Sequence, residues 1–297
     1  MSSLDLHLHT SVSNDADYSP AELLALAQRQ NVRTLAVTDH NSVRAVAETM
    51  KQGRQKGIRV IPGIEIDCQF EGVNLHMTAY GIRIDDPRYA QLEQFYVQQQ
   101  RHNSIQAVRQ VCEALQIQIP SSQLEALSVN GVLVPEDLAG WLLRQPQYMD
   151  APWLKPYRPS GSRADNPHVN FYWDYFAQGK PGYVPSLRKN ALEILALIHQ
   201  TAGKAAVAHP GINFRGKEEV LVRLLKQGVD ALEVYSSYHS QAQTMRFHQL
   251  ALEIGVMMTA GSDFHGHHKP AIDIGGIPWL DDETEVERFL NTLESVS

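Results

Sequence analysis

The stretch that decides the fold runs from Lys204 to Thr259 and reads KAAVAHPGINFRGKEEVLVRLLKQGVDALEVYSSYHSQAQTMRFHQLALEIGVMMT. Short apolar runs alternate in it with longer stretches of helical periodicity. Strands that alternate with helices are typical of a parallel sheet or barrel, so an α/β fold is predicted. The expected strands are 204–208, 230–235 and 255–259, and the expected helices between them are 217–227 and 241–253.

A similar rhythm fills the amino-terminal part of the chain. Residues 4–8 alternate between apolar and polar, which is the period of a strand. Ser19, Pro20 and Glu22 then form the start signal of a helix: a capping residue, a proline at the first helical position and a capping-box glutamate. That helix is expected over 21–30, further strands over 34–38, 59–61, 63–67 and 73–81, and further helices over 42–56, 190–202 and 284–295.

The middle of the chain lacks this rhythm. Residues 89–115 predict one long polar helix that is rich in glutamine, and the residues after it carry proline, tryptophan and tyrosine without a strand–helix repeat. We therefore expect a mostly helical insert within the α/β fold. The expected segments are 1–98 for the first part of the barrel, 99–186 for the insert and 187–297 for the second part.

Bulk composition narrows the classes of function. The net charge of −7 over 297 residues argues against a protein that holds duplex nucleic acid through bulk charge. No apolar run reaches transmembrane length and the start of the chain lacks signal-peptide character, so a cytoplasmic protein without membrane contact is expected. Cys68 and Cys112 lie far apart in the sequence and are expected to be reduced structural thiols.

Histidines and carboxylates gather where the predicted strands end. His7 and His9 are two residues apart on the first strand, and Asp263 and His265 have the same spacing after the last one, so each pair points one way. The carboxyl ends of parallel barrel strands converge on one face, where such side chains would meet. The candidates at these positions are His7, His9, Asp15, Asp39, His40, Glu65, His76, His209, Asp263 and His265.

These residue types favour a particular chemistry. Imidazoles and carboxylates without thiolates suit zinc, iron or manganese. Six histidines and three carboxylates are too many for one ion and fit two or three, with Glu65 able to bridge two of them. Clustered metals can activate a shared water and hold the attacking and leaving oxygens of a phosphoryl group. No Ser-His-Asp arrangement or glycine-rich phosphate loop in the sequence competes for this role.

Several motifs together resemble those of the PHP (polymerase and histidinol phosphatase) superfamily. They are HLHTSVSNDADYSP, AVTDHNSV, IPGIEI, NLHMTAYGI, VAHPG and AGSDFHG, and they cover most of the chain outside the insert. The motifs GKPGYVP and EVYSSYH resemble motifs of one subgroup, the stand-alone bacterial proteins of the 3′,5′-nucleoside bisphosphate phosphatase and 5′-to-3′ exoribonuclease group. The resemblance implies a metal-dependent phosphoesterase with a distorted (β/α)7 TIM-like barrel and a trinuclear metal site.

The resemblance also implies a ligand set for three divalent transition metals, with manganese expected and zinc or iron as alternatives. Asp15 takes the loop position in that set, and Asp17 is its alternative. Asp39 is expected to orient an imidazole and not to bind metal. The assigned ligands are His7, His9, Glu65 and Asp263 for the first metal, Glu65, His76 and His209 for the second, and Asp15, His40 and His265 for the third.

Substrate residues are harder to assign. The resemblance places His239 near the substrate, where an imidazole could bind phosphate or protonate a leaving group. Arg101, with His102 and Asn103, could bind a substrate phosphate, or these residues could form a solvated helix face. Three insert aromatics could stack on a base or form the core of the insert, and four other histidines are set aside as structural or exposed. These residues are Tyr172, Trp173, Tyr175, His199, His248, His267 and His268.

The function expected from this resemblance is hydrolysis of the 3′-phosphate of nucleoside 3′,5′-bisphosphates to nucleoside 5′-monophosphate and phosphate. Trimming of short 5′-phosphorylated oligoribonucleotides in the 5′-to-3′ direction is also expected, so the partners are a small nucleotide or short RNA. The nucleophile would be a metal-bridging hydroxide held by Glu65. One alternative is a histidinol-phosphate phosphatase. Another is a non-catalytic PHP module. Such a module would have lost some of the metal-ligand residues, whereas all nine ligand positions are occupied in this sequence.

Overall fold

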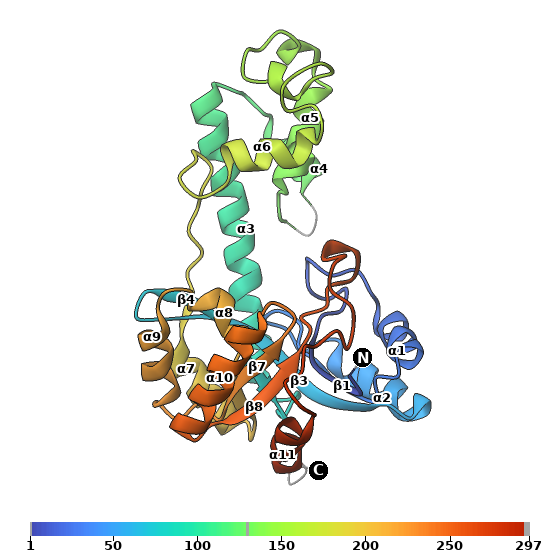
Figure 1. The fold of residues 1–297 in the computed structure, drawn as a ribbon. Helices are drawn as coiled ribbons and strands as arrows, with labels where there is room; N and C mark the ends of the chain where they lie inside the picture. Colours follow the sequence, from blue (N-terminus) through green and yellow to red (C-terminus); the bar gives the residue numbers. More distant parts are fainter. Residues whose placement is uncertain (1, 129–130, 294–297) are drawn as a thin grey trace. The chain divides into compact units, whose positions relative to one another are not determined.

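The computed structural model describes residues 2–128 and 131–293 (Figure 1). Contacts divide the chain into two compact units. The barrel unit comprises the residues up to Glu93 together with those from Arg188 onward, and the insert unit is Gln94–Leu187. The insert unit thus runs from Gln94 to Leu187, whereas the sequence predicted an insert over residues 99–186. No helix within the described ranges is both long and apolar enough to cross a bilayer.

The barrel unit is built on one sheet whose main path contains seven strands. Its order is β1-β2-β3-β4-β6-β7-β8, and the short β5 pairs with β3 outside this path. The strands are β1 (Leu4–Leu8), β2 (Thr34–Val37), β3 (Arg59–Phe70), β4 (Val73–Tyr80), β5 (Lys189–Asn190), β6 (Lys204–Val207), β7 (Ala231–Ser236) and β8 (Met257–Gly261).

The two outer strands of this path meet and nearly close the sheet. The Asp263 N–H donates to the His7 carbonyl at 2.9 Å, and the His9 N–H donates to the Phe264 carbonyl at 3.1 Å. These bonds join the end of β1 to the residues that follow β8. The expected barrel of seven strands is therefore confirmed, with its seam beside the predicted ligands.

The parallel strand direction that the alternation of strands and helices indicated does not hold at β4. This strand runs antiparallel to both β3 and β6, while the other pairs are parallel. Glu71 and Gly72 form the two-residue link from β3 to β4, with φ of 46° and 75°. Positive φ at both positions is typical of a type I′ hairpin, and a link of two residues is too short for a parallel crossover.

The helices of the barrel unit follow the sequence signals closely. Ser19 and Glu22 form the expected capping box, in which Ser19 N–H donates to the Glu22 carboxylate at 2.9 Å. Most predicted elements are found with their ends shifted by one or two residues. The helices are α1 (Pro20–Arg29), α2 (Val46–Lys56), α7 (Ala191–Gln200), α8 (Pro210–Asn213), α9 (Glu218–Leu225), α10 (Gln241–Ile254), α11 (Thr284–Thr292) and the 3-10 helix η3 (Gly266–His268).

Three predicted boundaries need correction or comment. The helix expected from residue 42 begins at Val46, after a turn that follows the backbone bonds of Asp39 and Asn41 to Glu65. The two strands expected at 59–61 and 63–67 are one continuous strand, β3. The last two residues of the helix expected over 284–295 lie outside the described residues.

Every named element of the insert unit within its described residues is a helix, and the unit has its own core. Tyr172 and Tyr175 pack against this core, which supports their structural interpretation, whereas Trp173 is 57% exposed. Its elements are the larger part of α3 (Pro87–Leu115), α4 (Ser121–Leu127), α5 (Pro135–Leu143), α6 (Pro167–Tyr175) and the 3-10 helices η1 (Pro146–Tyr148) and η2 (Lys155–Tyr157). The core includes Val108, Val111, Leu138, Leu142, Leu154, Phe171 and Phe176.

We predict that Gly261→Ala destabilises the barrel by about 1–3 kcal/mol, because a Cβ at this position would lie 2.1 Å from the His7 Cβ and push β8 from β1. Urea unfolding of both proteins measures the difference. Gly216→Asn is the control, since Gly216 has open space around its Cβ position and asparagine tolerates its φ of 70°. An unchanged midpoint for Gly261→Ala would contradict the close approach.

Candidate metal centre

The centre of the site is the carboxylate of Glu65, which is fully buried on β3. Five imidazoles from four separate segments of the barrel unit approach its two oxygens. A buried carboxylate is costly unless positive charge or donors surround it, so this crowd of nitrogens marks a site built around one anion. The distances are 3.2 Å to His7 Nε2, 3.2 Å to His9 Nε2, 3.1 Å to His40 Nδ1, 2.9 Å to His76 Nδ1 and 3.0 Å to His209 Nε2.

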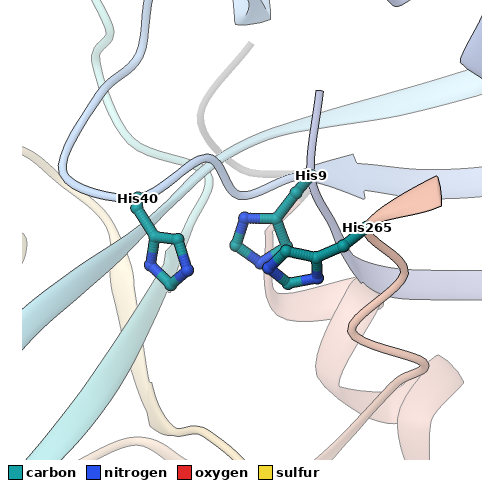
Figure 2. A group of neighbouring side chains, drawn as sticks. All are labelled: His9, His40 and His265. Carbon is teal, nitrogen blue, oxygen red and sulfur yellow. The ribbon is translucent and has the colours of Figure 1, made fainter. Parts of the chain in front are cut away.

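Three groups composed entirely of predicted ligands have the spacing needed to hold an ion. The first two are His7, His9, Glu65 with Asp263, and Glu65, His76 with His209. The third contains His9, His40 and His265, and Figure 2 shows His40 facing the stacked rings of His9 and His265. All of these side chains come from the barrel unit.

The loop after β1 brings Asp15 to the third group. Its Oδ2 lies 3.6 Å from His40 Nε2 and 3.4 Å from His265 Nε2. Asp17, the alternative, is instead bonded to His267, at 2.5 Å from the ring Nδ1 and 3.1 Å from the backbone N–H. The geometry thus favours Asp15, and the structure brings all nine predicted ligands together.

The hydrogen bonds of the imidazoles test whether metals fit here. In His7, His9 and His265 the Nδ1 has a partner, while the Nε2 is buried and has none. Glu65 Oε2 and Asp263 Oδ1, which are also buried without a donor, face these nitrogens. Lone pairs that face lone pairs require a cation between them, so the donor set fits metal ions.

Asp39 has the contacts expected of a residue that orients an imidazole. Its carboxylate accepts from the Thr10 N–H and hydroxyl, both at 2.7 Å, and from the Ser13 hydroxyl at 2.8 Å. The Ser13 oxygen in turn lies 3.1 Å from His9 Nδ1. Asp39 therefore acts on His9 through Ser13, and this chain of bonds leaves His9 Nε2 for the cluster.

Two carboxylates of the site were missed in the sequence. Glu233 is fully buried on β7, where it accepts from His7 Nδ1 at 2.7 Å and from the His209 N–H at 3.1 Å. Its signal was a single acid inside the otherwise apolar strand ALEVYS, since glutamate is rarely buried unless it is paired. Glu233 therefore orients ligands from two different strands.

Asp67 is the second missed carboxylate. Its carboxylate lies 2.9 Å from His76 Nε2 and 3.0 Å from Arg188 Nη1, and it accepts from Asn41 Nδ2 at 3.1 Å. Asp67 follows Glu65 by two residues, so the strand period alone put both carboxylates on one face. It completes a fourth group with metal-ligand spacing, together with His40 and His76.

Charge in the site is strongly coupled. Burial raises the pKa of Glu65, but the surrounding imidazoles of His7, His76 and His40 lower it further, so that it lies well below its usual range. Burial lowers the pKa of His76, yet Glu65 and Asp67 raise it to about 10. The metal-free cluster therefore keeps Glu65 ionised and holds protons on imidazoles.

Some ligands occupy left-handed backbone conformations that side chains rarely adopt. His209 has φ of 26° and Asp263 has φ of 60°. Such conformations cost on the order of 1–3 kcal/mol each and persist only where other contacts hold them. Here the His209 N–H is held by Glu233 and the Asp263 N–H by the His7 carbonyl. The strain is thus balanced by the same residues that shape the cluster.

The structure places His239 differently from the expectation. Its Nδ1 donates to the Val234 carbonyl at 2.9 Å and its Nε2 accepts from the Gly211 N–H at 3.1 Å. Burial lowers the pKa of this ring, which agrees with a neutral imidazole. With both nitrogens engaged, His239 has no atom left for a substrate phosphate, and it supports the turn after His209 instead.

Comparison with known proteins agrees with this geometry. Residues 5–130 match the family model described as PHP domain. The chain contains a PHP domain. It is 28% identical to the 5′-3′ exoribonuclease Rnm of Escherichia coli (93% of this chain, 89% of the relative). It is 25% identical to the 3′,5′-nucleoside bisphosphate phosphatase of Chromobacterium violaceum (93% of this chain, 91% of the relative).

A solved structure supports the fold of this PHP protein. It comes from Bifidobacterium adolescentis, and its name classes it with metal-dependent phosphoesterases. It superimposes with a TM-score of 0.69 at 21% identity and covers 97% of this chain and 96% of its own. The chain is thus a metal-dependent phosphoesterase whose residues 5–130 match the PHP domain. Bound metals would supply an acidified water and positive charge for phosphoryl oxygens, and the residues above orient their ligands.

We predict that metal binding releases protons. The pKa of His7, His40 and His76 is raised in the metal-free protein because, against burial, Glu65 and neighbouring carboxylates favour their charged forms. Metals need neutral nitrogens, so affinity should rise with pH from about 6.5 toward 10 as these protons leave. Calorimetric titration with Mn²⁺ in buffers of different ionisation enthalpy counts the protons. Release on the order of one or more per chain is expected, and none would contradict the charge state derived above.

Proposed function

We propose that this PHP protein hydrolyses the 3′-phosphate of nucleoside 3′,5′-bisphosphates, giving nucleoside 5′-monophosphate and phosphate. Short 5′-phosphorylated oligoribonucleotides would be trimmed from the 5′ end by the same reaction. The observation that carries the proposal is the convergence of nine imidazole and carboxylate ligands, the buried Glu65 among them. The names of the relatives, which match most of this chain, support the substrate class.

Three divalent transition metals are proposed for the site, with manganese first and zinc or iron as alternatives. The three groups of ligands around Glu65 support this number. Nitrogen and carboxylate donors without thiolate support this choice of metals. Glu65 would be shared between the first two ions, because its oxygens face ligands of both groups.

The proposed reaction has no covalent enzyme intermediate. Ser13 is a hydroxyl in contact with the cluster, and it already donates to Asp39 while it lies 3.1 Å from His9 Nδ1 and accepts from the His40 N–H. It is therefore a poor nucleophile, and an activated water would attack phosphorus in line. Glu65, held between five imidazoles, would keep the donors at a fixed separation during the attack.

The 5′-phosphate of the substrate would be bound by residues of α3. Arg101, His102 and Asn103 are proposed for this role, and Arg101 and His102 are exposed on the insert unit. Arginine suits the task because its planar fork matches two phosphate oxygens. Since both nitrogens of His239 are engaged, Arg101 would bear most of this recognition. The exposed Trp173 remains a candidate for stacking on a base.

We predict that Glu65→Gln lowers turnover by about 10²-fold or more, because an amide cannot supply the charge that Glu65 shares between two ions. Phosphate release from adenosine 3′,5′-bisphosphate and elemental analysis of bound metal measure the loss. Circular dichroism checks the fold, and Glu253→Gln, on the exposed face of α10, is the control. Turnover within a few-fold of wild type would show that Glu65 does not bridge metals.

We predict that removing the 5′-phosphate from the substrate lowers kcat/KM by about 10²-fold or more, since binding energy from a remote phosphate is used in catalysis. Arg101→Ala should largely erase this difference, whereas Arg144→Ala in the same unit should keep it. Adenosine 3′,5′-bisphosphate, adenosine 3′-monophosphate and histidinol phosphate are compared under one Mn²⁺ loading. If histidinol phosphate is the best of the three substrates, a histidinol-phosphate phosphatase is favoured. If none of the three substrates is turned over, a non-catalytic module is favoured.

A further inference from the structure

The two oxygens of Asp263 have different surroundings. Oδ1 is buried without a hydrogen-bond donor and faces the cluster, at 3.0 Å from His9 Nε2 and 3.4 Å from His7 Nε2. Oδ2 accepts two hydrogen bonds, from the Tyr238 hydroxyl at 2.6 Å and from Lys269 Nζ at 2.7 Å. One oxygen of the carboxylate is thus free to bind a metal, whereas the other already accepts two hydrogen bonds.

Tyr238 and Lys269 also contact each other. The Lys269 ammonium donates to the Tyr238 oxygen at 2.9 Å and lies 5.5 Å from the centre of its ring. An ammonium only donates, so the single phenol hydrogen of Tyr238 is left for Asp263. The three groups form a closed triangle with one possible direction for every bond.

This triangle restricts how Asp263 can bind an ion. Hydrogen bonds to a charged group are stronger than those between neutral groups, and rotating Oδ2 toward a metal would break two of them. The left-handed backbone of Asp263, with φ of 60°, further limits the side chain. Only Oδ1 is therefore free to act as a ligand.

We propose that Tyr238 and Lys269 are positioning residues that make Asp263 a one-oxygen ligand of the first metal and set the affinity of that site. The inference rests on the proposed ligation by Asp263 and goes beyond it, since neither residue belongs to the ligand set that the sequence implied. Partners that orient a ligand typically change metal affinity by about 10–100-fold when they are removed.

The loop that carries Lys269 has a second, independent anchor. His267 is bonded to Asp17 through both its ring and its backbone N–H, and its ring stacks on Tyr18. His267→Ala therefore disturbs the same loop while leaving the groups around Asp263 untouched. It serves as the matched control for an effect that comes from loop structure alone.

The test is titration of metal-free protein with Co²⁺, followed by visible absorption, with a chelator competition for affinity. Tyr238→Phe and Lys269→Met should each weaken the tightest site by about 10-fold and change the Co²⁺ spectrum. The double variant should lose less than the sum of the two effects, because both act on one oxygen. Lys269→Arg, which keeps charge and donors, should restore the wild-type spectrum.

Two results would overturn the inference: unchanged affinity and spectrum in the folded double variant, or an equal change in His267→Ala. Turnover of adenosine 3′,5′-bisphosphate at saturating Mn²⁺ is measured separately on the same proteins. Altered Co²⁺ binding in a protein whose wild type lacks this turnover would remove the proposed function and leave the positioning role. Normal turnover with unaltered Co²⁺ binding would instead support the proposed function and remove the positioning role.

Discussion

The barrel unit depends on one constraint, which is the burial of the Glu65 carboxylate among five imidazoles. An isolated buried anion would cost several kcal/mol, and here that cost is offset only when strands β1, β3 and β4 and the segments after β2 and β6 all reach their places. The charge that makes the site reactive is therefore also a condition on the fold. Since imidazoles gather protons or metals around Glu65, folding and metal occupancy are linked.

A shell of carboxylates surrounds this centre and fixes the imidazoles. Glu233 acts on His7 and on the backbone of His209, Asp67 acts on His76, and Asp39 acts on His9 through Ser13. Apart from the bond to the His209 backbone, each bond occupies one ring nitrogen and leaves the other for the centre, as ligand-orienting residues do in metal sites. Some of the carboxylates that give the chain its net negative charge therefore lie inside the site.

The seam between β1 and β8 is where the fold and the site meet most closely. Asp5 is fully buried and accepts from the Ser262 N–H at 2.9 Å and the Gly275 N–H at 2.8 Å, which fixes the segment that presents Asp263. Burial, only partly opposed by these bonds, raises the pKa of Asp5 to about 6. Gly261 allows the two backbones to approach beside His7. Backbone geometry at the seam therefore sets the positions of ligands from both ends of the chain.

Structural features that depend only on neighbouring residues along the chain could be predicted from the sequence. Strand and helix periods, the Ser19 capping box and the two-residue spacing of His7 with His9 are local, so they predicted the elements and the ligands at strand ends. Only the tertiary structure decided the antiparallel direction of β4 and the partners of Glu233, Asp67 and His239. Those bonds join residues far apart in sequence, such as His7 and Glu233, which are separated by 226 positions. Local patterns carry no information on such pairings, because closure of the barrel creates them.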